Sequence, residues 1–282
     1  MTQLTRITAL SPAKLNLFLH ITGQREDGYH TLQTVFQMLD WGDDMVFELS
    51  ADPGVTLTTP MPSVATEDNL IVRAAKLLID ASPAAQYGAS ISITKRIPQG
   101  GGLGGGSSNA ATTLLALNQL WGLGHSTQTL AEMGLSLGAD VPVFVHGKSA
   151  WAEGIGEQLQ PMELPERWYV ILLPDCHVST AKIFSSAQLT RDTSPITMSA
   201  FFAGAVCNDL QPVVEAHYPV VRKALNLLGR FAPAMMTGSG ACVFAAVDDM
   251  ASAQLIASKT QTQFTTIVAR GMNHRPTALA VT

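Results

Sequence analysis

Charged side chains are scarce in this chain. Asp, Glu, Lys and Arg make up 14% of its 282 residues, whereas an average soluble domain contains about 25%. The 17 basic and 22 acidic residues leave a net charge of −5, so the sequence lacks the basic excess that a nucleic-acid-binding surface needs. An anionic small molecule could still bind through local geometry instead of a global positive field.

Cysteine pairs, zinc motifs and long apolar runs are also lacking. Cys176, Cys207 and Cys242 form no CxxC pair, and the seven histidines show no HExxH spacing, which argues against a zinc site. Three unpaired thiols are typical of a reducing compartment. No apolar run reaches the roughly 18–20 residues of a membrane span, and the N-terminus lacks the layout of a secretion signal. We therefore expect a cytoplasmic protein that does not bind membranes.

The composition is otherwise that of a folded globular protein. Apolar residues make up 46% of the chain, and the length fits one large or two ordinary domains. Strand-like and helix-like segments are mixed without strict βαβ alternation, which predicts an α+β fold. Prolines and glutamates gather at residues 161–166. We place the boundary there, between an N-terminal domain at 1–160 and a C-terminal domain at 161–282.

Hydrophobic periodicity predicts the individual elements. Strict alternation predicts two strands joined by a polar turn at residues 23–28. Helices are expected from residue 67, with Thr66 as the cap, and at 107–121, 126–138, 180–189, 209–228 and 250–259. Strands are expected at 13–21, 31–39, 45–49, 55–59, 91–97, 141–145, 151–159, 168–173, 241–247 and 264–269.

A glycine-rich loop precedes the helix expected at 107–121. Six of the nine residues at 99–107 are glycine, which lets backbone N–H groups converge on one point. The following helix N-terminus favours anions, so the segment predicts a phosphate site. Ser107 stands where a Walker A motif requires lysine, and no acid lies near residues 122–126 for a dinucleotide site. The alternative is a flexible linker, but linkers rarely lead directly into an Ala/Leu helix.

Four further residues have two readings when taken alone. Lys14 lies on the polar face of the first strand and could hold a ligand, but the pattern favours an edge strand with the lysine in water. Asp140 could accept a hydroxyl proton, but a turn aspartate that bonds its own backbone is the simpler reading. Tyr29 and His30 could stack on and hydrogen-bond a ring, or could form a half-buried pair at a strand start.

The order of the motifs is more informative than any one of them. Three motifs, at residues 12–16, 98–111 and 237–241, resemble those of the galactokinase, homoserine kinase, mevalonate kinase and phosphomevalonate kinase superfamily. Three more, at residues 28–30, 67–70 and 138–142, are similar to its 4-diphosphocytidyl-2-C-methyl-D-erythritol kinase branch. Together they span nearly the whole chain. The resemblance is specific, because unrelated chains would not repeat all six motifs in order.

The resemblance implies a fold and a reaction. The fold is a two-domain small-molecule-kinase α+β fold, with an N-terminal ATP-binding domain and a C-terminal ferredoxin-like domain. The reaction transfers the γ-phosphate of ATP to the 2-hydroxyl of 4-diphosphocytidyl-2-C-methyl-D-erythritol, in non-mevalonate isoprenoid precursor biosynthesis. ATP and Mg²⁺ are the implied cofactors, and the protein is expected to be a monomer or homodimer.

The resemblance also assigns roles to residues. Asp140 would take the hydroxyl proton, with Lys14 beside it. Tyr29 and Phe184 would sandwich the cytosine, and His30 would bond its edge. Asn16 and Thr180 would touch the substrate, while Asn69 and Lys95 would approach the adenosine. The ATP phosphates would be held by Pro98, Gly100, Gly101, Gly102, Leu103, Gly104, Gly105, Gly106, Ser107 and Ser108.

Magnesium has no acidic partner in or beside the glycine loop. We therefore expect ATP oxygens and water to hold it, with Ser108 as the candidate protein ligand. Two other functions stay open. A mevalonate- or homoserine-type kinase would have no ring for Tyr29, His30 and Phe184 to bind. A non-catalytic nucleotide-binding protein would not need Lys14 and Asp140 together.

Overall fold

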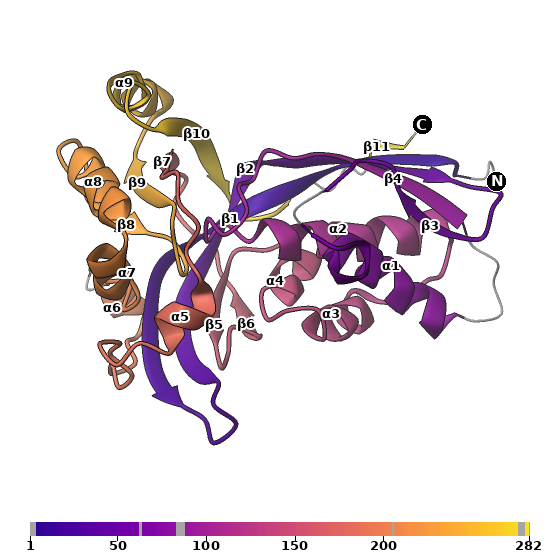
Figure 1. Ribbon diagram of the computed structural model, residues 1–282, viewed down its shortest axis with the longest axis horizontal. Coiled ribbons are helices and arrows are strands. Elements are labelled where there is room, and N and C mark those ends of the chain that lie inside the picture. Colours follow the sequence, from indigo (N-terminus) through magenta and orange to yellow (C-terminus); the bar gives the residue numbers. More distant parts are fainter. Residues whose placement is uncertain (1–3, 62–63, 83–87, 205, 276–279, 282) are drawn as a thin grey trace.

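A long antiparallel hairpin forms the backbone of the molecule. The structure is a computed structural model that describes residues 4–61, 64–82, 88–204, 206–275 and 280–281. Strands β1 (Arg6–Gln24) and β2 (His30–Leu49) pair along their length, with register shifts near residues 13, 17 and 22. Figure 1 shows this hairpin crossing the molecule from the upper right, where it lies above helices α1–α4, to the lower left, where its tip projects at the bottom.

The N-terminal half packs helices against one face of this hairpin and its neighbours. β4 pairs with β2 and β3, and β5 pairs with β2 and β6. The strands are β3 (Gly54–Leu57), β4 (Gly88–Thr94), β5 (Ala150–Glu153) and β6 (Gln158–Pro161). The helices are a 3₁₀ turn (Thr66–Asp68), α1 (Leu70–Ala81), α2 (Gly105–Leu120), α3 (Thr127–Leu135) and α4 (Val141–His146).

The C-terminal half is an antiparallel sheet in the spatial order β10-β7-β9-β8. In chain order these strands are the fourth, first, third and second, which is the ferredoxin-like arrangement expected from the resemblance. They are β7 (Trp168–Leu173), β8 (Ala234–Met236), β9 (Val243–Val247) and β10 (Thr265–Met272). The helices are α5 (Thr180–Phe184), α6 (Met198–Phe202), α7 (Gln211–His217), α8 (Pro219–Leu228) and α9 (Met250–Thr260). A short strand, β11 (Ala280–Val281), pairs with β1.

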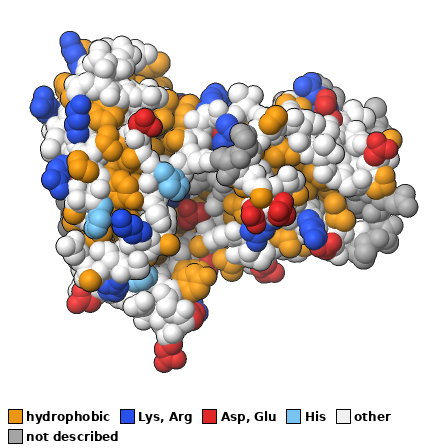
Figure 2. Space-filling view, viewed as in Figure 1, with side chains coloured by type: hydrophobic (Ala, Val, Ile, Leu, Met, Phe, Trp, Pro, Cys, Tyr) orange, Lys and Arg blue, Asp and Glu red, His pale blue; other side chains and the backbone are white. Residues whose placement is uncertain are grey.

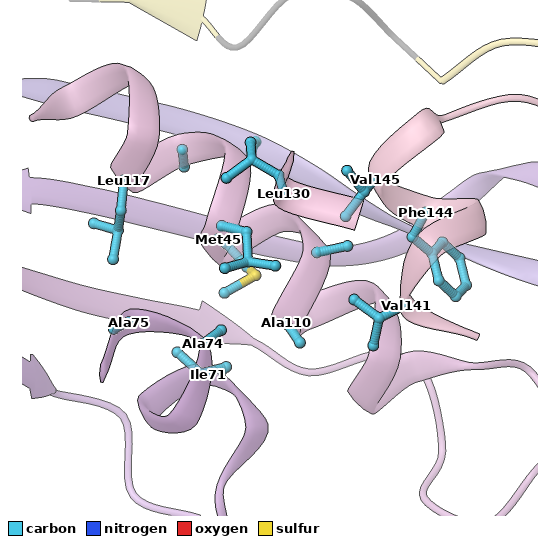
Figure 3. Packing of buried hydrophobic residues seen from close by; sticks show 14 of the residues in the cluster. Met45, Ile71, Ala74, Ala75, Ala110, Leu117, Leu130, Val141, Phe144 and Val145 are labelled. Carbon is cyan, nitrogen blue, oxygen red and sulfur yellow. The ribbon is translucent and has the colours of Figure 1, made fainter. Parts of the chain in front are cut away.

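Each half has its own apolar core, and the hairpin contributes to both. Helix α1 buries Ile71, Ala74 and Leu78, which are spaced three to four residues apart on one helical face. They pack with α2, α4 and the N-terminal sheet (Figure 3). Leu19 and Ile21 of β1 instead join the core of the C-terminal half. The mixed α+β architecture is therefore confirmed, with β1 and β2 as its common element.

Several element predictions were wrong at specific residues. Residues 141–145 form the fully buried helix α4 instead of a strand; its Pro142 suits a first helical turn. The helix expected at 209–228 is two helices, α7 and α8, because Pro219 has no N–H to continue the first. The helix expected at 180–189 ends at Phe184. Asn69 caps α1, since its side chain accepts from Ile71 N, and Thr66 does not. The extended segment at 151–159 is a hairpin, β5 and β6.

Within the described part of the chain, no helix is both long and apolar enough to cross a membrane. All three cysteines are free thiols. Cys242 is buried behind the glycine loop, and burial raises the pKa of its thiol to about 12. A thiol in that environment is a packing residue, because thiolate formation there is unfavourable.

The buried His20 predicts a pH dependence of stability. Its Nδ1 has no hydrogen-bond partner within the described residues. Burial lowers its pKa below 6.5, and the charge of Asp209 opposes this only in part. The unfolded chain therefore binds a proton at this histidine more readily than the folded chain does. The free energy of unfolding is thus highest above pH 6.5 and decreases as the pH falls from 6.5 through the lowered pKa of the folded state. Urea unfolding of the wild type should show this loss, and His20→Gln should show less of it. An exposed-site control, His274→Gln, should keep the wild-type slope; an unchanged slope in His20→Gln would contradict the assignment.

Candidate active site

Two adjoining cavities lie between the halves of the molecule. The larger, about 730 Å³, is lined by the hairpin tip, the middle of β1 and helix α5. The second, about 450 Å³, is lined by the glycine loop and the start of α1. Gly102, Gly104, Thr180 and Ser239 belong to both linings. Figure 2 shows the surface hollowed between the two lobes. A molecule in one cavity can therefore meet a molecule in the other at the glycine loop.

The glycine loop is folded as a phosphate site requires. Gly100, Gly102 and Gly104 have φ of +67°, +76° and +72°, a region that side chains disfavour. Helix α2 begins immediately afterwards, at Gly105, and its first residues line the second cavity. Their N–H groups and the helix dipole form an anion-binding end.

A second glycine turn, at residues 237–240, closes against the first. A Cβ added to Gly102 would lie 2.1 Å from the carbonyl oxygen of Thr237, so only glycine fits there. Backbone hydrogen bonds run from Ala241 N to Gly100 O and from Cys242 N to Gly101 O, both 3.1 Å. The two glycine turns are thus joined across 135 residues or more of sequence, and they form one wall of the site.

Lys14 and Asp140 meet at the junction of the cavities. Lys14 Nζ lies 3.3 Å from Asp140 Oδ2 and donates to Gly102 O at 3.1 Å and to Asn16 Oδ1 at 2.5 Å. The Lys14 side chain is only 3% exposed, so the edge-strand reading was wrong. Asp140 is 34% exposed and makes no capping bond to α4, so the turn-aspartate reading was wrong as well. A carboxylate held by an ammonium therefore faces the larger cavity.

Aromatic side chains lie at the other end of the larger cavity. Tyr29, at the hairpin tip, is 63% exposed. The rings of His30 and Phe184 are 5.1 Å apart, centre to centre. Burial, followed by the charge of Arg191, lowers the pKa of His30 below 6.5. This end can hold a flat ring, with a neutral imidazole at its edge.

The remaining predicted residues are distributed over the two cavities. Asn16 lines the larger one, and its side chain also donates to Thr34. Thr180 Oγ1 lies 2.8 Å from Ser239 Oγ across the shared boundary. Asn69 and Lys95 line the second cavity, as do Pro98, the loop glycines, Leu103 and Ser107. Ser108 differs: its side chain is fully buried and accepts from Ser11 Oγ, away from the cavity wall. Ser107 is thus the better-placed loop hydroxyl for a metal.

Asp43 is a residue that the sequence reasoning missed. Its fully buried carboxylate pairs with Lys95 Nζ at 2.5 Å and accepts from Asn109 Nδ2 at 2.9 Å. The same carboxylate accepts from the backbone N–H groups of Arg96 and Ile97. It therefore links the segment between β4 and the glycine loop to helix α2, which follows the loop. An acid inside an apolar strand was the only signal available, because each partner lies at least 52 residues away.

Removal of Asp43 should destabilise the protein strongly. Asp43→Ala leaves Lys95 without its carboxylate partner and two backbone N–H groups without their acceptor, so we expect a loss of roughly 3–5 kcal/mol in the free energy of unfolding. The neighbouring Asp44 is 59% exposed and pairs with Arg96 at the surface. Asp44→Ala is a matched control that should cost less than about 1 kcal/mol. Urea denaturation measures both, and equal losses would remove the special role of Asp43.

Two family models match separate parts of the chain, and curated relatives match nearly all of it. The model described as GHMP kinases N terminal domain matches residues 69–148, and GHMP kinases C terminal matches residues 197–265. The 4-diphosphocytidyl-2-C-methyl-D-erythritol kinase of Marinobacter nauticus is 52% identical over 277 residues, covering 97% of this chain and 96% of that one. The enzyme of the same name from Pseudomonas fluorescens is 53% identical over 268 residues, covering 95% and 94%.

Solved structures agree with these matches. A crystal structure of 4-(cytidine 5'-diphospho)-2C-methyl-D-erythritol kinase superposes with a TM-score of 0.83 at 31% identity, covering 94% of this chain and 98% of that chain. A mevalonate kinase structure superposes with a TM-score of 0.70 at 15% identity, over 95% and 99% of the two chains, and shows the shared fold alone. The chain therefore belongs to the GHMP kinases and, within them, to the 4-diphosphocytidyl-2-C-methyl-D-erythritol kinase family.

Proposed function

We propose that this protein transfers the γ-phosphate of ATP to the 2-hydroxyl of 4-diphosphocytidyl-2-C-methyl-D-erythritol, a step of non-mevalonate isoprenoid precursor biosynthesis. The relatives that match nearly the whole chain carry the name of this kinase. The observation that carries the proposal is the Lys14–Asp140 pair, 3.3 Å apart, at the junction of the two cavities. That junction is where a phosphoryl donor in one cavity would meet a hydroxyl in the other.

ATP would lie in the second cavity. The glycine loop and the N-terminus of α2 offer backbone N–H groups to its phosphates. Asn69 and Lys95, on the same wall, would lie near the adenosine. We also propose that the domain boundary lies at residues 160/161. The two halves would bind the donor and the acceptor between them.

Magnesium would be held mainly by the phosphates and water. In the described residues, no three His, Cys, Asp or Glu side chains gather as a metal cluster. Ser107 is the loop hydroxyl that lines the cavity, and oxygen donors of this kind suit Mg²⁺. Bound with ATP, the ion would neutralise charge on the phosphate oxygens.

Asp140 would act as the base and Lys14 as its electrostatic partner. The 2-hydroxyl oxygen forms a bond to the γ-phosphorus while the bond from that phosphorus to the bridging oxygen breaks, leaving ADP. Asp140 accepts the hydroxyl proton as this happens. Lys14 holds the carboxylate toward the cavity and balances negative charge on the transferring group. Little covalent chemistry falls to the protein, which mainly positions the two reactants.

The acceptor would lie in the larger cavity, with its cytosine at the aromatic end. Tyr29 and Phe184 would sandwich the base, and His30 would bond its edge. Asn16 and Thr180 also line this cavity and would touch the acceptor. Binding energy from the remote base can then hold the 2-hydroxyl in register with the phosphate.

ADP release tests the function directly. ATP with Mg²⁺ is supplied with three acceptors in parallel: 4-diphosphocytidyl-2-C-methyl-D-erythritol, mevalonate and homoserine. We expect turnover of the cytidine compound alone. Turnover of another acceptor would keep the phosphate site and reject the aromatic clamp. If no ADP is released with any of the three acceptors although ATP still binds, the protein is better explained as a non-catalytic nucleotide-binding protein.

Asp140→Asn should lower kcat by roughly 10²–10⁴, the range for loss of a positioned base. KM for both substrates should stay close to the wild-type value, because the amide keeps the shape of the side chain. Steady-state kinetics measure both constants. Asp44→Asn, the same change at an exposed position outside both cavities, is the control. A kcat within a few-fold of wild type would exclude Asp140 as the base.

Tyr29→Ala should raise KM for the cytidine acceptor and leave KM for ATP unchanged. Loss of one stacked ring costs roughly 1–3 kcal/mol of binding free energy, which is about a 5- to 150-fold rise in KM. Tyr29→Phe keeps the ring and should restore most of the affinity. Equal rises for both substrates would contradict the clamp.

A further inference from the structure

Arg191 connects His30 with Phe184, two of the residues at the ring-binding end of the larger cavity. Its Nε–H donates to His30 Nε2 at 3.0 Å. Its Nη2 donates to the carbonyl oxygens of Phe184 and Ser186, at 2.9 and 2.8 Å, and its Nη1 donates to that of Leu189 at 3.1 Å. The guanidinium therefore connects the segment that follows α5 with the hairpin. These two parts of the chain lie beside each other in Figure 1.

The Arg191 contact decides which nitrogen of His30 carries the proton. A guanidinium has N–H donors and no acceptor, so His30 Nε2 must accept through its lone pair. A neutral imidazole whose Nε2 accepts carries its hydrogen on Nδ1. A protonated imidazole has hydrogens on both nitrogens and could not accept from Arg191 at all. The lowered pKa of His30, from burial and then from the charge of Arg191, agrees with a neutral ring.

The remaining nitrogen is free to act on a ligand. The two ring nitrogens of an imidazole point to opposite sides, so Nδ1 points away from Arg191. His30 lines the larger cavity, and none of the hydrogen bonds found among the described residues uses its Nδ1. His30 therefore presents a single N–H donor whose identity and direction are fixed. The centre of its ring lies 5.1 Å from the centre of the Phe184 ring.

We propose that Arg191 is a positioning residue that sets the base specificity of the acceptor cavity, by fixing His30 as an Nδ1–H donor beside Phe184. This inference rests on the proposed function, in which that cavity takes a pyrimidine nucleotide. The N3 atom of cytosine is an unprotonated acceptor and pairs with such a donor. Uracil carries a hydrogen on N3, so two donors would face each other and neither would have an acceptor.

Loss of Arg191 should relax this choice. In Arg191→Met, the imidazole can adopt the tautomer with hydrogen on Nε2 and offer an acceptor to uracil. A buried donor left without an acceptor weakens binding about 5- to 150-fold. We expect the wild type to favour cytidine over uridine by about that factor, and Arg191→Met to lose most of it. If the substitution only loosened Phe184, cytidine and uridine would both bind more weakly, and the ratio of their affinities would not change.

Two measurements on the full-length protein test the proposal. Nitrogen-15 NMR of the imidazole in the free wild type should show hydrogen on Nδ1 and none on Nε2. Calorimetry with cytidine diphosphate and uridine diphosphate, at saturating ADP to fill the other cavity, should give the preference in the wild type and its loss in Arg191→Met. Arg222→Met is the matched control, since Arg222 is exposed and pairs with Glu215.

Either of two outcomes would overturn the proposal. One is a wild type with hydrogen on Nε2 of His30, which needs no variant to observe. The other is a cytidine-to-uridine ratio that Arg191→Met does not change. Because neither measurement needs turnover, both stay decisive if the kinase assay fails. A chain that binds cytidine diphosphate selectively but phosphorylates no acceptor would reject the proposed function and keep the role of Arg191.

Discussion

A lysine ammonium buried between the two cavities sets the geometry of the site. An unpaired charge in that position would be strongly unfavourable, because it has lost most of its hydration. Lys14 is compensated by the Gly102 carbonyl, the Asn16 amide and the Asp140 carboxylate. These partners come from the glycine loop, from β1 and from the residue before α4. Each of the three segments therefore has to be in place before the lysine is satisfied, and once they are, the carboxylate and the phosphate loop are next to each other.

The β1–β2 hairpin explains how two separate cores hold one site. One part of the hairpin packs on α1, α2 and α4, whereas Leu19 and Ile21 pack into the C-terminal half. Lys14 and the aromatic tip lie on the same long strand pair. A shift of one half against the other would therefore disturb both cavities. Hydrogen bonds from Ala241 and Cys242 to the glycine loop oppose such a shift.

Buried polar contacts between distant segments hold the walls of the site. Asp43 joins Lys95 to Asn109 on the nucleotide side. Asn208 holds the second glycine turn through the carbonyls of Met236 and Gly238. Arg191 joins the hairpin to the end of α5. In each case one side chain satisfies several groups that would otherwise be buried without partners. Of these three residues, Asp43 and Asn208 are buried and Arg191 is half-buried.

Local sequence determined much of this protein. Alternation predicted the two long strands, glycine content predicted a phosphate loop before a helix, and the ordered motifs indicated the family. Tertiary structure decided the rest. Residues 141–145 are apolar enough for a buried strand or a buried helix, and only packing between α2 and α3 distinguishes the two. Lys14 and Asp140 each favoured a simpler reading alone, because their pairing spans 126 residues of chain that no periodicity reports. Asp43 and Arg191 gave almost no signal, since a side chain's value as a buried partner depends on groups that only the folded chain brings near it.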